Sequence, residues 1–265
     1  MTRLFKRIIP VISAILLLSV LSGCATYRSG DAAVYSPVTL AVAEPTLGTH
    51  FAVMPISRIT PNKTGEWWEK RHNLLNERAA EGDHDLIFIG DSITHAWENG
   101  GKEVWAKYYE SRNAMNLGIS GDRTQHVIWR LQNGNFKGQT PKLCVIMIGT
   151  NNYDDNNAEE ISDGIIAIVY EILRQSPDSK VLILGIFPRF EKPHPKRAML
   201  AEASALSSKL ADGERVFYLD ISDAFLDDDG TLPKEIMPDF LHPNRKGYGI
   251  WAEAMEPTIK ELLGE

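Results

Sequence analysis

The sequence predicts an α/β domain, a three-layer α/β/α sandwich with a flavodoxin-like parallel sheet of about five strands. Short apolar runs such as 86–89 and 143–148 each stop at a glycine, and such runs are typical of strands buried on both faces. Between these runs, apolar residues recur at helical spacing. Because strands that alternate with helices form right-handed βαβ units, we expect the strands to be parallel.

The same patterns place the elements in order along the chain. The helix over 158–175 shows the clearest amphipathic face, made of isoleucine and valine. Asp122 is expected to act as a helix N-cap, and Pro243-Asn244 precedes the last helix. The expected strands are 85–90, 114–118, 143–148, 181–187 and 216–219. The expected helices are 64–80, 102–109, 122–131, 158–175, 197–210 and 245–263.

The first residues predict export and a lipid anchor. Residues 1–23 combine a basic start with an apolar stretch too short to span a bilayer comfortably, as in secretory signal peptides. The stretch ends in Leu21-Ser22-Gly23-Cys24, which resembles the lipobox of bacterial lipoproteins. This resemblance implies that Cys24 carries a lipid, with Ala25 favouring an outer-membrane location on the periplasmic or the cell-surface face. An ordinary signal peptide or an uncleaved anchor is the alternative.

Composition and length then limit how many domains the chain can form and which partners it can bind. Residues 24–60 lack periodicity and are expected to form a flexible tether, whereas residues 61–265 are enough for one domain with a full core. Without residues 1–23 the net charge is −10, so nucleic acid is not an expected partner. Cys24 and Cys144 are the only cysteines. Cys144 stands in an apolar run and is expected to be a core residue.

Small and polar residues stand where the first three predicted strands end. In parallel sheets, ligands bind outside the carboxyl ends of the strands. These ends are therefore the expected place for an active site. They read Gly90-Asp91-Ser92, Asn116-Leu117-Gly118 and Gly149-Thr150-Asn151-Asn152.

A serine, a histidine and an aspartate in such loops indicate nucleophilic catalysis. A serine hydroxyl is a weak nucleophile unless a base takes its proton. Asp239-Phe240-Leu241-His242, near the other end of the chain, supplies a base and a carboxylate on one turn. We expect Ser92 to attack a carbonyl carbon, His242 to accept its proton, and Asp239 to orient the imidazole. A capping aspartate before a surface histidine is the alternative.

These blocks, in this order, resemble the SGNH (GDSL-type) hydrolase family, and most closely its members like the platelet-activating-factor acetylhydrolase catalytic subunits. The resemblance implies carboxylic ester hydrolysis through an acyl-enzyme. It also implies an oxyanion hole formed by the amides of Ser92 and Gly118 and the side chain of Asn151. Alternatively, Gly118 simply ends a strand and Asn151 caps a helix. Further similar segments are Gly121-Asp122-Arg123-Thr124, Trp129-Arg130-Leu131, Pro188-Arg189 and Glu191-Lys192-Pro193.

No metal or cofactor is expected. The sequence contains neither a His-Glu-x-x-His pattern nor paired cysteines nor a phosphate-cradling glycine loop. Asp227-Asp228-Asp229-Gly230 does not fit the calcium-loop ligand pattern. Two other histidines, His95 and His126, are expected at helix surfaces.

The leading hypothesis is a lipid-anchored serine esterase that removes short acyl groups, mainly acetyl, from carbohydrate or small-molecule esters. The segment 61–265 leaves no long insertion for a lid, and Arg123 near the cleft suits a carboxylate or sugar hydroxyls better than a phospholipid. The alternatives are an O-acyltransferase with the same triad, a phospholipid or platelet-activating-factor-type acetylhydrolase, and a non-catalytic flavodoxin-like binding lipoprotein.

Overall fold

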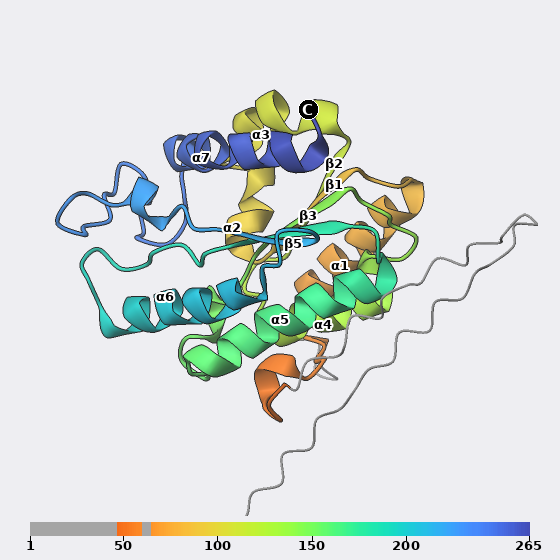
Figure 1. Cartoon of the computed structure of the whole chain (residues 1–265), viewed down its shortest axis with the longest axis horizontal. Coiled ribbons are helices and arrows are strands. Elements are labelled where there is room, and N and C mark those ends of the chain that lie inside the picture. The colour runs from red at the N-terminus through yellow and green to blue at the C-terminus, as the bar shows by residue number, and fades with distance from the viewer. Residues whose placement is uncertain (1–46, 60–64) are drawn as a thin grey trace, which may run out of the picture. The chain divides into compact units, whose positions relative to one another are not determined.

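The computed structural model describes residues 47–59 and 65–265, whose strands form one parallel sheet in the order β2-β1-β3-β4-β5 (Figure 1). Every neighbouring pair is parallel, and the register aligns Gly90 at the end of β1 with Gly118 at the end of β2. The strands are β1 (Leu86–Gly90), β2 (Ala114–Gly118), β3 (Leu143–Met147), β4 (Lys180–Leu184) and β5 (Val216–Leu219).

Helices cover both faces of the sheet, which confirms the predicted three-layer α/β/α architecture. Because side chains alternate along a strand, Ile87 and Ile89 pack on one face and Leu86 and Phe88 on the other. The first face is covered by α1 (Glu66–Glu81), α4 (Thr124–Arg130), α5 (Ala158–Gln175) and α6 (Pro195–Ser207) (Figure 1). The second is covered by α2 (Ser92–His95), α3 (Lys102–Tyr108) and α7 (Arg245–Leu263).

Three local expectations differ from the structure. Strand β4 stops at Leu184 rather than 187, because its neighbour β5 ends at Leu219, whose carbonyl accepts the last hydrogen bond of this pair from the amide of Gly185. Helix α2, four residues long, is too short to show periodicity in the sequence. Asp122 is not a helix cap. Helix α4 has Arg123 as its N-cap residue, and the Asp122 side chain is fully buried.

Residues 47–59 pack against the sheet domain although they belong to the segment expected to be a tether, 24–60. Thr124 Oγ1 donates to the carbonyl of Ala52 at 2.8 Å, and the amide of Ile56 donates to the carbonyl of Gln125. His50 Nε2 lies 3.1 Å from the carboxylate of a residue on α5. Part of this segment is therefore integral to the folded domain.

The expected signal peptide, residues 1–23, and the lipid site Cys24 lie outside the described residues. Among the helices of the described part, none is long and apolar enough to cross a membrane.

Candidate active site

Strand β1 delivers Ser92 to the carboxyl edge of the sheet. A side chain at Gly90 would collide with Thr94 and with the backbone of β3, so a glycine is needed where the strand ends. Asp91 follows as the N-cap of α2, and its Oδ1 accepts a hydrogen bond from the amide of Ile93 at 3.0 Å. This cap fixes Ser92 as the first residue of α2, half-exposed at the strand end.

The structure brings the three predicted catalytic side chains together. His242 Nε2 lies 2.8 Å from Ser92 Oγ. The other ring nitrogen, His242 Nδ1, lies 2.6 Å from Asp239 Oδ2. Serine, imidazole and carboxylate thus form a hydrogen-bonded chain, although 150 positions separate the serine from the histidine in the sequence.

A tight turn holds the aspartate against the histidine. Asp239 Oδ1 accepts hydrogen bonds from the amides of Leu241 and His242, at 3.1 and 2.8 Å. The intervening Phe240 has φ = +57°, and its carbonyl accepts from the amide of Phe190, which has φ = +67°. Partial burial raises the pKa of Asp239, but the hydrogen bonds from His242 outweigh it and lower the pKa below its usual value. The carboxylate therefore stays charged beside the imidazole.

The structure corrects the expected oxyanion donor Gly118. Its amide donates to Asn116 Oδ1 at 2.7 Å, and the residue is buried against the backbone of α2. Gly121, three residues on, is exposed with φ = +74°. Among the described residues, neither its amide nor that of Ser92 has an acceptor. Gly121 is thus the better-placed glycine, although nothing in the sequence distinguishes it from Gly118.

Asn151 lies beside the same turn. Its Nδ2 donates to the carbonyl of Asp122 at 2.9 Å and lies 3.4 Å from Asp91 Oδ2. The amide thereby connects the loop after β3 with the loops after β1 and β2. Asn152 is buried and bonds with Thr124, so its side chain supports the loop rather than facing the site.

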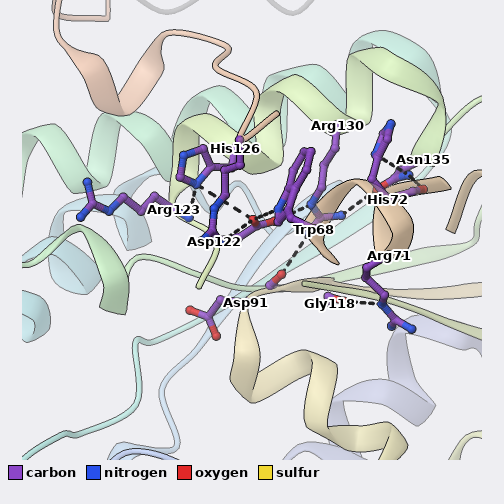
Figure 2. Close-up of polar contacts among 12 residues, drawn as sticks. Trp68, Arg71, His72, Asp91, Gly118, Asp122, Arg123, His126, Arg130 and Asn135 are labelled. Carbon is purple, nitrogen blue, oxygen red and sulfur yellow. Dashed lines mark hydrogen bonds and ion pairs between the residues drawn. The ribbon is translucent and has the colours of Figure 1, made fainter. Parts of the chain in front are cut away.

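A buried ion pair lies beneath these loops (Figure 2). Asp122 and Arg130 are both fully buried, and Arg130 Nε donates to Asp122 Oδ2 at 2.7 Å. Trp68 Nε1 donates to the other carboxylate oxygen at 2.6 Å. Arg130 Nη2 also donates to the carbonyl of Gly90 at 3.0 Å. The pair therefore joins the ends of β1 and β2 to helices α1 and α4, a role that local sequence patterns did not reveal.

The other titratable groups near the site are held by other contacts. Asp91 is fully buried and accepts the capping hydrogen bond from Ile93, and burial raises its pKa to about 7. His95 and His126 are half-buried rather than surface residues: His95 Nδ1 bonds with Ser120, and His126 Nδ1 accepts from the amide of Arg123. Burial lowers the pKa of both histidines. His242 is therefore the histidine that the structure places on the serine.

Two further expectations concern Cys144 and Arg123. Cys144 is fully buried in β3, and burial raises its thiol pKa, as suits a core residue. Arg123 forms an ion pair with Asp155, so its charge is partly neutralised. In residues 47–59 and 65–265, no group of three or more His, Cys, Asp or Glu residues is arranged to hold a metal ion.

Comparison with known proteins agrees with this geometry. Residues 88–250 match the model of the GDSL-like lipase/acylhydrolase family. The human platelet-activating factor acetylhydrolase IB subunit alpha2 is 37% identical over 202 residues, which cover 75% of this chain and 86% of that protein. The human subunit alpha1 is 33% identical over 216 residues, which cover 80% of this chain and 92% of that protein.

Solved structures share the fold at lower identity. A GDSL-like lipase from Bacteroides thetaiotaomicron superposes with a TM-score of 0.56 at 18% identity, covering 72% of this chain and 97% of that one. The acetylxylan esterase Axe2 from Geobacillus stearothermophilus superposes with a TM-score of 0.54 at 19% identity, covering 69% of this chain and 96% of that one. Family match, relatives and fold agree, and the chain belongs to the GDSL-like lipase/acylhydrolase family, as a serine esterase of the SGNH type.

Proposed function

We propose that this esterase removes short acyl groups, acetyl first, from carbohydrate or small-molecule esters through an acyl-enzyme formed on Ser92. The observation that carries the proposal is the unbroken hydrogen-bonded chain from Ser92 through His242 to Asp239. A binding protein would not need a base held on a nucleophile, so this chain argues against the non-catalytic alternative.

The residues act in sequence during each half-reaction. His242 takes the proton of Ser92 as the hydroxyl oxygen attacks the ester carbonyl, and then gives that proton to the departing alcohol. Asp239 keeps Nε2 of the imidazole directed at the serine and stabilises the imidazolium. Water then attacks the acyl-enzyme, with His242 again accepting and returning a proton. The carboxylic acid leaves, and Ser92 regains its hydroxyl.

We assign the stabilisation of the negative charge on the carbonyl oxygen to the amides of Ser92 and Gly121 and to the side chain of Asn151. One N–H of Asn151 is held by the carbonyl of Asp122, and the other must turn from its long contact with Asp91 to the oxyanion. Asn151→Ala is expected to lower kcat by about 10²- to 10³-fold with little change in KM, because such donors act mainly in the transition state. Steady-state kinetics on an aryl acetate measure this effect. Asn113→Ala, at the opposite edge of the sheet, is the matched control; equal kinetics for both variants would contradict the assignment.

Acyl length is expected to be limited to two to four carbons. The longest irregular stretch, around 222–238, turns Phe225, Leu232 and Met237 into the core, so they are not available to line an acyl tunnel. Further methylenes then remain in water and lose the roughly 0.8 kcal/mol that each would gain on burial. Specificity constants for aryl esters from acetate to laurate, and for acetylated sugars, test this. A maximum at eight or more carbons would refute it.

Platelet-activating-factor-type hydrolysis is the second candidate, because the human alpha2 subunit, a relative named for that activity, is 37% identical. Both candidates release acetate. Comparing acetylated oligosaccharides with acetylated ether phospholipids at equal concentration decides between them, and adding an acceptor alcohol or glycan separates hydrolysis from acyl transfer.

We also propose that the chain is exported and anchored to the outer membrane through a lipid on Cys24. Its support is the lipobox-like Leu21-Ser22-Gly23-Cys24 behind the apolar stretch of residues 1–23. Cys24→Ser is expected to release the protein from the membrane fraction or to leave an unprocessed precursor. Fractionation and intact mass measure this, with Cys144→Ser as control; unchanged membrane association and mass for Cys24→Ser would contradict the anchor.

A further inference from the structure

An arginine from the N-terminal segment, residues 47–59, lies against the turn that holds Gly121. Arg58 Nη1 donates to the carbonyl of Ser120 at 2.9 Å. A methyl group built on Gly121 would lie only 2.9 Å from the same nitrogen. Arg58 therefore stands next to the proposed oxyanion hole, although it precedes the matched family region, residues 88–250.

The charge of Arg58 is only weakly compensated. Asp122 Oδ1 lies 3.9 Å away, but this buried carboxylate already binds Arg130 and Trp68 at much shorter distances. No other carboxylate within the described residues pairs with Arg58. Its side chain is 29% exposed, so a positive charge faces solvent beside the turn.

Two further arginines lie near this turn, and Arg130 is the one that is paired with Asp122. Arg123 follows Gly121 and Asp122 in the chain. Its ion pair with Asp155 partly neutralises its charge. His126 has a pKa of about 3, chiefly because it is buried, and Arg58, Arg123 and Arg130 lower it further. A neutral acetyl ester needs no such charge, whereas an anionic ester would be attracted by it.

We propose that Arg58 is a specificity-determining residue that binds a carboxylate on the alcohol part of the substrate. The preferred substrates are then esters of acidic carbohydrates, such as acetylated uronic acids. One nitrogen of the guanidinium holds Ser120, while its other N–H groups have no acceptor among the described residues and suit a carboxylate oxygen. The ring centre of Trp67 lies 5.2 Å from Arg58 Cζ, within the range of a cation–π contact. This inference rests on the proposed esterase function.

The test compares esters of the same shape that differ by one charge. The probes are 3- and 4-acetoxybenzoate and the two corresponding acetoxybenzamides, so that two positions of the carboxylate are sampled. For the full chain, Arg58→Ala is expected to lower kcat/KM for at least one benzoate by about 10- to 100-fold, the range of a charge-assisted hydrogen bond. The benzamides, which lack the carboxylate, are expected to lose at least tenfold less than that benzoate, and any loss that they share reflects the bond from Arg58 to Ser120. High salt is expected to reduce the preference of the wild type.

Two conservative variants and a distant control complete the design. Arg58→Lys keeps the positive charge and is expected to retain part of the preference for the benzoates. Arg58→Gln keeps N–H donors but no charge and is expected to show no such preference. Arg215→Ala, at the amino end of β5, is expected to change neither ester class. Thermal unfolding of each variant verifies that it is folded.

Each alternative outcome has a definite meaning. An equal loss on benzoates and benzamides would show that Arg58 only positions the turn, and unchanged kinetics would show that it does not contact the substrate; either overturns the inference while leaving the esterase function intact. Failure of the wild type to hydrolyse any of the four esters in a Ser92-dependent manner would instead overturn the proposed function.

Discussion

Ser92→Ala is expected to lower kcat for aryl acetates by about 10⁴- to 10⁶-fold, because it removes the atom to which the acyl group is transferred. The remaining rate over water would come from substrate binding and the oxyanion donors alone. A fluorophosphonate probe is expected to label the wild type once per chain and to leave Ser92→Ala unlabelled. With an ester whose acyl-enzyme is hydrolysed slowly, the amplitude of the initial burst of alcohol release would measure how much acyl-enzyme forms per chain.

The control for this variant is Ser111→Ala, an exposed serine before β2 at the opposite edge of the sheet. It is expected to retain wild-type kinetics and labelling. Persistent labelling of Ser92→Ala, or a kcat within tenfold of wild type, would require a different nucleophile.

Much of the fold, and the meeting of Ser92, His242 and Asp239, could be predicted because the relevant signals are local. Apolar runs that end at Gly90, Gly118 and Gly149 mark strands and place their loops at one edge. Asp239 and His242 lie on one turn, where a three-residue spacing lets the side chains meet. The order of these blocks and their family resemblance then connected the turn with Ser92.

The oxyanion donor could not be predicted in the same way. Gly118 and Gly121 both stand near the end of β2, and the sequence does not show which amide is already bonded. In the structure, Asn116 takes the amide of Gly118, while Gly121 stays exposed in a left-handed conformation. The distinction depends on a contact two residues away that has no sequence pattern of its own.

Asp122 and Arg58 were missed because their partners are distant in the sequence. An aspartate before a helix resembles a cap, yet Asp122 is buried by Trp68, 54 positions earlier, and by Arg130, eight positions later. Arg58 meets Ser120 across 62 positions. Irregular composition around Arg58 favoured a tether, because composition does not reveal tertiary hydrogen bonds.

Asp122→Asn is expected to lower the free energy of unfolding by about 3–5 kcal/mol. The change is isosteric, but it leaves the guanidinium of Arg130 buried and without its counter-charge, and breaking a buried pair typically costs this much. For a domain of this size, each kcal/mol shifts Tm by about 2–4 °C, so thermal and denaturant unfolding will both detect the loss. Lys142→Ala, which breaks an exposed ion pair with Asp85, is the control and is expected to change stability by no more than about 1 kcal/mol.

A double variant separates the charge from the packing. Asp122→Leu combined with Arg130→Met removes both buried charges and is expected to recover part of the stability lost in Asp122→Asn, since buried pairs can be replaced by apolar residues of similar volume. The activity of the double variant is expected to be lower than that of the wild type, because the bond from Arg130 to the carbonyl of Gly90 is lost next to Ser92. Wild-type stability in Asp122→Asn would show that the charge of Arg130 is compensated by other groups, and full activity in the double variant would show that the pair does not position the active-site loops.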